Sequence, residues 1–152
     1  MLSRLIHTSC TEQTEQAGAA LAQRMLGESL PPFVALYGDL GVGKTAFVRG
    51  FASVLCPGSP VRSPTFSLVY EHRGRVKDLF HFDMYRITDE DDLYSIGFDD
   101  YLARDGICLV EWSENIPYAI PPHHIAVTIE KNDPCDPQSR LIRIEERKEP
   151  PC

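Results

Sequence analysis

The sequence lacks the residue patterns that mark a disulfide-stabilised protein or a zinc site. Its five cysteines, at positions 10, 56, 108, 135 and 152, include no C-x-x-C pair, and its five histidines form no H-E-x-x-H pattern. An odd number of unpaired cysteines predicts reduced thiols. Cys108 lies inside the apolar run ICLVEW and is expected to be a small core residue.

Positive charge and long apolar runs are also scarce. Asp and Glu number 22 against 15 Lys and Arg, which gives a formal net charge of -7. Proteins that bind nucleic acid directly use many Lys and Arg contacts to phosphates, so any link to RNA should run through a partner protein. No apolar run is long enough to span a bilayer, and the first residues, MLSRLIHTSC, lack a secretory apolar core. We predict a cytoplasmic protein without membrane contact.

The 152 residues, 43% of them apolar, are enough for one domain around a single core. We predict this domain over residues 1–147 and a disordered tail over 148–152. Strand patterns alternate with helix patterns along the first half, and two hairpin patterns follow. A capping box, Ser9-x-x-Glu12, is expected to open the first helix, and Thr88 a later one. The polar stretch KNDPCDPQS is expected to separate the last two strands.

The stretch GDLGVGKT matches the phosphate-binding loop pattern G-x-x-x-x-G-K-T. Its glycines let several N–H groups converge on one anion, at the start of a helix whose dipole favours negative charge. Lys44 can reach the outer phosphates, and Thr45 can offer its hydroxyl to Mg²⁺. A predicted strand, FVALY, precedes the loop and a predicted helix follows it, so the alternative of a turn that binds nothing is disfavoured. The predicted nucleotide-binding residues of the loop are Gly38, Asp39, Leu40, Gly41, Val42, Gly43, Lys44, Thr45 and Ala46.

Two predicted strands end in a carboxylate that could complete a magnesium site. ICLVE places Glu111 where a buried strand delivers a metal-binding carboxylate beside the phosphate loop, although the residue could instead face solvent. LFHFD ends in Asp83, which could hold the metal's water or orient the water that attacks the γ-phosphate. Its alternative role is to cap a turn.

Other residues have less decided roles. Ser63-Pro64-Thr65 puts hydroxyls on a proline-stiffened loop that could sense the γ-phosphate. His81 shares a strand face with Asp83 and could tune it, or could be a hydrogen-bonded structural histidine. Arg49 and Arg86 both remain possible partners for phosphate or carboxylate.

Two other classes of phosphate-loop protein fit the sequence less well. A GTPase would need an Asn-Lys-x-Asp segment and an Asp-x-x-Gly switch, and neither occurs. A small-molecule kinase usually closes an arginine-bearing lid over the donor phosphates, whereas the segment after Ile87 is acidic. A kinase therefore stays a secondary hypothesis.

Four motifs together, GDLGVGKTAFVRGF, SPTFSLV, FHFDMYR and CLVEWSE, resemble the TsaE (YjeE) family in their order and intervals. The resemblance spans nearly the whole chain. It implies an α/β fold of the P-loop NTPase type, a single domain with a mixed central β-sheet flanked by helices. It also implies a weak Mg²⁺-dependent ATPase that assists formation of threonylcarbamoyladenosine in tRNA with the TsaD and TsaB proteins.

The same resemblance implies roles for individual residues. Thr45 and Glu111 would hold Mg²⁺, Thr65 would sense the γ-phosphate, and Asp83 would orient the attacking water. Trp112 would lie beside the nucleotide, and the helix start near Thr11 would touch the adenine. An alternative hypothesis is a nucleotide-gated binding module that regulates its partners without needing ATP turnover.

Overall fold

The computed structural model describes residues 1–39, 41–61 and 68–151. The strands are β1 (Ser3–Thr8), β2 (Phe33–Tyr37), β3 (Val69–His72), β4 (Asp78–Asp83), β5 (Gly106–Glu111), β6 (His124–Asp133) and β7 (Asp136–Arg147). The α-helices are α1 (Thr11–Gly27), α2 (Lys44–Leu55), α3 (Glu90–Ser95) and α4 (Phe98–Leu102), with short 3₁₀ helices η1 (Ser113–Asn115) and η2 (Pro117–Ala119). Within the described residues no helix is both long and apolar enough to cross a membrane.

All seven strands form one mixed sheet in the order β1-β7-β6-β2-β5-β4-β3. The four inner strands β6, β2, β5 and β4 run parallel to one another, whereas β3 pairs antiparallel with β4, β7 with β6, and β1 with β7. The prediction of a single α/β domain with a mixed sheet is therefore confirmed. Because β2, β5 and β4 are parallel, their carboxyl ends meet at one edge of the sheet, where ligands bind in open α/β folds.

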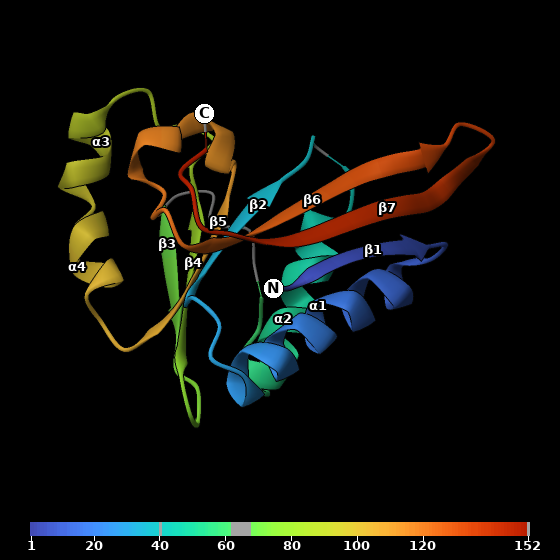
Figure 1. The fold of residues 1–152 in the computed structure, drawn as a ribbon, viewed down its shortest axis with the longest axis horizontal. Coiled ribbons are helices and arrows are strands. Elements are labelled where there is room, and N and C mark those ends of the chain that lie inside the picture. The colour runs from blue at the N-terminus through green and yellow to red at the C-terminus, as the bar shows by residue number, and fades with distance from the viewer. Residues whose placement is uncertain (40, 62–67, 152) are drawn as a thin grey trace.

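Alternate residues of the buried strands supply two separate cores, one on each face of the sheet. Val34 and Leu36 of β2 pack with α1 and α2, while Phe33 and Ala35 pack on the opposite face with the residues around α3 and α4. This is the two-residue period of a strand buried on both faces. Figure 1 shows α1 and α2 beneath one side of the sheet and α3 and α4 beside the other.

Helices α1 and α2 cross in direct backbone contact. A Cβ atom added at Gly50 would lie 1.8 Å from the Glu15 carbonyl oxygen, and one added at Gly18 would lie 2.1 Å from the Phe47 carbonyl oxygen. Only glycine fits at both positions, because a side chain would force the helices apart. The contact fixes the start of α1 relative to α2, and α2 is the helix that follows the phosphate loop.

Several sequence expectations need correction. Ser9 does not cap α1: its N–H and its hydroxyl both donate to the Gln13 side chain, at 2.7 and 3.1 Å, and the helix begins at Thr11. Thr88 does not cap α3 either, because Asp89 accepts the Asp92 N–H while Thr88 donates to the Asp92 carboxylate.

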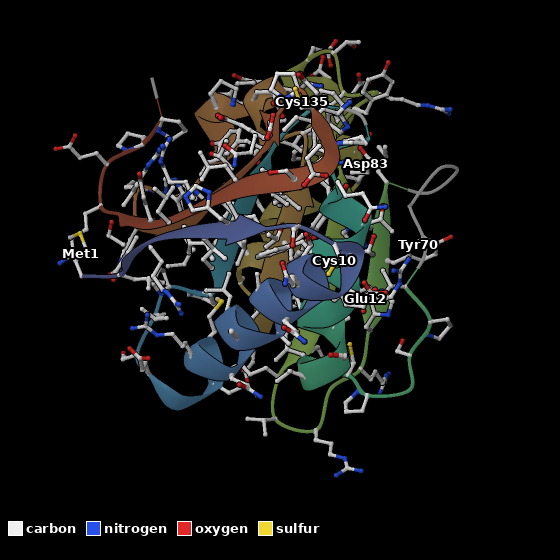
Figure 2. All side chains as sticks on the ribbon, turned by 90° about the vertical axis from the view of Figure 1, so that its right-hand side faces the viewer. Met1, Cys10, Glu12, Tyr70, Asp83 and Cys135 are labelled. Carbon is white, nitrogen blue, oxygen red and sulfur yellow. The ribbon has the colours of Figure 1, made fainter. Side chains whose placement is uncertain are left out.

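The last hairpin is longer than expected. KNDPCDPQS was predicted to separate two strands, but β6 continues to Asp133 and β7 starts at Asp136, so the pairing extends almost to the turn. Figure 2 looks toward this tip, marked by Cys135. Cys108 is buried in the core as predicted, and burial raises the pKa of its thiol to about 12.

Candidate functional site

The phosphate-loop segment joins the carboxyl end of β2 to the start of α2. Gly38, Gly41 and Gly43 have φ angles of 150°, 79° and 104°, which residues with a Cβ atom rarely adopt. Phe47 N–H donates to the Gly43 carbonyl at 3.1 Å as the first bond of α2. The N–H groups of the three residues before Phe47 therefore have no acceptor within the helix, and they can bind an anion.

Close packing also requires glycine at position 38. A Cβ atom there would lie 2.7 Å from the Ile129 carbonyl oxygen of β6 and 2.9 Å from the Val42 side chain. The end of β2 thus turns directly against β6. Leu40 was predicted to belong to the binding loop, and it lies outside the described residues.

Lys44, the first residue of α2, is buried and has two close partners. Its ammonium donates to the Gly38 carbonyl at 2.6 Å and lies 3.9 Å from the centroid of the Trp112 ring. Burial lowers the pKa of Lys44, and the carboxylates of Glu111, Glu114, Asp83 and Asp39 oppose that shift. Lys44 is thus a cation surrounded by acidic groups from three segments of the chain.

Glu111 ends β5 and is buried, so the alternative of a solvent-facing side chain is wrong. Its Oε2 lies 2.6 Å from Nε2 of His81 on the neighbouring strand β4. The ring nitrogen on the other side, His81 Nδ1, is buried and has no partner among the described atoms. The sequence left His81 open as a residue that tunes Asp83 or as a hydrogen-bonded structural histidine, and its hydrogen bond goes to Glu111.

Asp83 ends β4 directly beside Glu111, its register partner on β5. Burial raises the pKa of Asp83, and the nearby Glu111 carboxylate raises it further. The Tyr85 N–H, which donates a hydrogen bond to Asp83 at 2.9 Å, opposes this rise, as do the neighbouring His81 and Lys44. The hydrogen bond from Tyr85 means that Asp83 also caps a turn, the alternative role expected from the sequence. Two carboxylates so close favour a bound cation or a shared proton.

Trp112 follows Glu111 in a conformation that bulky residues avoid. Its φ of 58° is the one positive value at a described residue other than glycine, and such strain often marks functional positions. The conformation puts the ring over Lys44 and against Tyr85, with ring centroids 5.0 Å apart. Asn115 donates to the Met84 carbonyl at 2.9 Å and so ties the segment after β5 to the end of β4.

Some predicted residues lie elsewhere or cannot be placed. Thr65, with Ser63 and Pro64, lies outside the described residues. Arg49 points to α1, where it forms an ion pair with Glu15 at 2.8 Å. Arg86 is exposed after β4.

The beginning of α1 lies beside the phosphate loop. Thr11 is exposed at the first position of this helix. One turn later, the Thr14 methyl carbon would lie 3.8 Å from a Cβ atom on Gly43. The predicted neighbourhood of Thr11 is therefore close to the loop, while contact with a base stays a prediction.

Sequence reasoning missed two residues at this site. Glu114 lies close enough to Lys44 to influence its pKa, and burial raises the pKa of Glu114 itself. Its position three residues after Glu111 was the available signal. Arg140 of β7 donates to the Val42 carbonyl of the loop at 2.7 Å. No local pattern indicates a contact between residues so distant in sequence.

The donor set suits Mg²⁺ better than a metal held by protein alone. No group of three or more His, Cys, Asp or Glu side chains in the described part of the chain could hold a metal ion. Mg²⁺ keeps several waters and uses one or two protein ligands together with phosphate oxygens. Glu111, beside the loop lysine, and the Thr45 hydroxyl on the first turn of α2 are residues of that kind.

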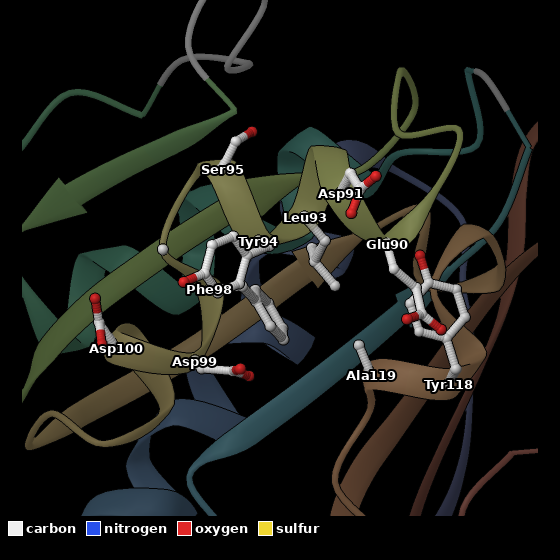
Figure 3. Close-up of a pocket in the computed structure, with 11 residues that line it drawn as sticks. Glu90, Asp91, Leu93, Tyr94, Ser95, Phe98, Asp99, Asp100, Tyr118 and Ala119 are labelled. Atoms are coloured by element: carbon white, nitrogen blue, oxygen red, sulfur yellow. The ribbon is translucent and has the colours of Figure 1, made fainter.

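A hollow lined by other residues lies beside α3 and α4. This cavity of about 630 Å³ is surrounded by acidic side chains, among them Glu90, Asp91, Asp99 and Asp100, and by Tyr94 and Tyr118 (Figure 3). Its negative charge opposes the binding of a nucleotide triphosphate. This cavity is therefore a poor candidate for phosphate binding.

Comparison with known proteins agrees with this geometry. The family model for the threonylcarbamoyl adenosine biosynthesis protein TsaE matches residues 8–141. Among solved structures, Bacillus subtilis YdiB aligns with a TM-score of 0.72 and 28% identity, covering 94% of this chain and 84% of YdiB.

Three curated relatives carry the name tRNA threonylcarbamoyladenosine biosynthesis protein TsaE. The Haemophilus influenzae protein is 42% identical over 66% of this chain and 63% of its own length. The Bacillus subtilis protein is 41% identical over 63% of this chain and 60% of its own length. The chain thus spans less than two thirds of either protein, whereas the Rickettsia bellii protein is 31% identical over 95% of this chain and 96% of its own length.

Proposed function

Because this chain belongs to the TsaE family, we propose that it is an ATP-binding and ATP-hydrolysing subunit needed for threonylcarbamoyladenosine modification of tRNA. The observation that carries the proposal is the convergence at one sheet edge of the loop lysine Lys44 with Glu111 and Asp83. A glycine turn without a ligand would need neither a buried ammonium nor paired carboxylates, and burying such charges is costly.

The loop would bind the phosphates of ATP through N–H groups from Gly41 to Ala46 and through the Lys44 ammonium. Among the described residues, one hydrogen bond, to the Gly38 carbonyl, accounts for only one of the three N–H groups of Lys44. Phosphate oxygens would also reinforce the charged form of this lysine, whose pKa is lowered by burial. Trp112, stacked against Lys44, would then border the nucleotide.

Thr45 and Glu111 would hold the Mg²⁺ that accompanies ATP. When bound, the ion would neutralise charge on the phosphates. It would also reduce the electrostatic repulsion among the carboxylates around Lys44, which are Asp39, Asp83, Glu111 and Glu114. His81 would keep the Glu111 carboxylate in place through its 2.6 Å hydrogen bond. Asp83, with its raised pKa, would orient the attacking water and accept its proton.

Turnover would serve a larger assembly. We propose that TsaD and TsaB carry out the transfer chemistry and hold the tRNA, while ATP hydrolysis here resets their complex. The net charge of -7 supports an arrangement in which this subunit does not bind RNA itself. Thr65 would sense the γ-phosphate in that cycle.

The proposal is tested by steady-state ATP hydrolysis of the chain alone and mixed with TsaD and TsaB, followed by tRNA modification over several cycles. We expect weak hydrolysis alone and a rise with the partners. Glu111→Gln should abolish repeated modification. If this variant hydrolyses no ATP yet supports repeated cycles, the chain is a nucleotide-gated module; transfer of labelled phosphate to a small acceptor would indicate a kinase.

A further inference from the structure

Arg140, near the start of β7, binds two backbone carbonyls of the phosphate-loop segment. Its Nε donates to the Val42 carbonyl at 2.7 Å, and its Nη2 lies 3.4 Å from the Gly41 carbonyl. The remaining nitrogen, Nη1, donates to the carbonyls of Pro137 and Ser139 at 2.7 and 2.9 Å. The last two bonds fix the guanidinium to its own strand, so the first two fix the loop to β7.

The charge of Arg140 is not neutralised by an acidic partner. Among the described residues no carboxylate lies within ion-pair distance of its guanidinium, whereas Arg143 and Arg147 on the same strand both pair with Glu145. The four bonds of Arg140 all go to carbonyl oxygens. Its positive charge therefore adds to the potential at the loop, in a protein whose net charge is -7.

The direction of these bonds determines where the loop N–H groups point. In a planar trans peptide the N–H of one residue points opposite to the C=O of the residue before it, and none of the described peptide bonds is cis. With the Gly41 and Val42 carbonyls turned toward Arg140, the N–H groups of Val42 and Gly43 point away from it. These N–H groups belong to the part of the loop that would surround a phosphate.

We propose that Arg140 is a positioning residue: it holds two peptide planes of the phosphate loop with their carbonyls toward β7 and their N–H groups free for the nucleotide phosphates. The inference rests on the proposed function, because it assumes that the loop binds ATP. Arg140 would touch no phosphate itself. It would act by lowering the cost of ordering the loop on binding.

The test is calorimetric titration of four chains with MgADP and with magnesium tripolyphosphate: wild type, Arg140→Gln, Arg140→Lys and Arg143→Gln. Arg143 is the matched control, since it is an exposed arginine on the same strand and its loss changes the net charge equally. We expect Arg140→Gln to weaken both ligands by about tenfold or more, and Arg143→Gln to stay within about twofold. Arg140→Lys should fall between them, because lysine cannot hold two carbonyls in a fixed geometry.

The two ligands separate this inference from a general loss of structure. Tripolyphosphate has no base or sugar, so an equal fold-loss for both ligands assigns the effect to the phosphate loop. Melting temperatures are measured alongside, and Arg140→Lys serves if Arg140→Gln does not fold. Wild-type affinity in Arg140→Gln would overturn the role of Arg140 while leaving the proposed function intact; no binding by the wild type would overturn both.

Discussion

Replacing His81 with leucine tests whether the His81 side chain stabilises the buried Glu111 carboxylate at the end of β5. The His81 Nε2–Glu111 Oε2 bond is 2.6 Å long, and the two side chains are only 1% and 8% exposed. Leucine fills a similar volume but leaves the Glu111 carboxylate buried without this donor. An unsatisfied buried polar group costs about 1–3 kcal/mol, and more when it is charged.

We therefore expect His81→Leu to reduce the free energy of unfolding by about 2–4 kcal/mol. For a chain of this size each kcal/mol lowers the melting temperature by about 3 °C, so the shift should be roughly 6–12 °C. Glu111→Leu alone removes the carboxylate and also its attraction for Lys44. The double variant should cost about 1–3 kcal/mol less than the sum of the single changes, because both partners of the bond are then absent.

The assay is urea unfolding of the four chains of this cycle in the absence of nucleotide, followed by fluorescence. Equal m-values would show that the variants unfold from equally compact states. A His81→Leu chain as stable as the wild type, or strictly additive effects, would refute the view that His81 supports Glu111.

Three further predictions concern charge, packing and the tryptophan. Asp83→Asn should lower the rate of ATP hydrolysis by about a hundredfold. It should also stabilise the protein at neutral pH. Burial raises the pKa of Asp83, so the stability that the protonated carboxyl contributes is lost as pH rises through that raised pKa. Melting curves should show this gain shrinking in acid, and a gain that grows in acid would contradict the assignment. Gly50→Ala should destabilise the protein by about 3 kcal/mol or more, because its Cβ would meet the Glu15 carbonyl. Gly27→Ala is the control: nothing lies within 4 Å of its Cβ, so it should leave stability unchanged or raise it. Equal melting temperatures for these two variants would count against the helix contact. Trp112 is the single tryptophan and lies 3.9 Å from the Lys44 ammonium, so its emission should change when MgATP is added, and an unchanged spectrum would place the nucleotide elsewhere.

The sequence predicted best those elements that have strong local signals. β2 matches the predicted run FVALY, and α2 begins at Lys44 and ends before Pro57-Gly58, because glycine and proline fix those boundaries. The capping box failed because Gln13 competed for Ser9. At α3 the neighbouring Asp89 was the better acceptor. In both cases two neighbouring side chains could accept the capping hydrogen bond, and the capping rule predicted the one that does not accept it.

At the candidate site, too, positions with strong local signals could be predicted, and contacts between distant segments could not. That Lys44, Glu111 and Asp83 lie together could be predicted, because each lies at a strand end or in a loop motif and the parallel sheet brings these positions to one edge. The partner of His81 depends on the register between β4 and β5, which one strand's pattern does not reveal. Arg140 reaches the loop because β7 folds back along β6 and β1, and that contact is a property of the topology.

The proposed function requires that the loop from Gly38 to Thr45 bind the phosphates of magnesium-bound ATP. Calorimetric titration of the wild type and of Lys44→Ala with MgATP, with melting temperature as a folding control, tests it most directly. We expect a saturable heat for the wild type and no saturable heat for a Lys44→Ala chain that still folds. No measurable heat from the wild type, or equal affinity in Lys44→Ala, would contradict it.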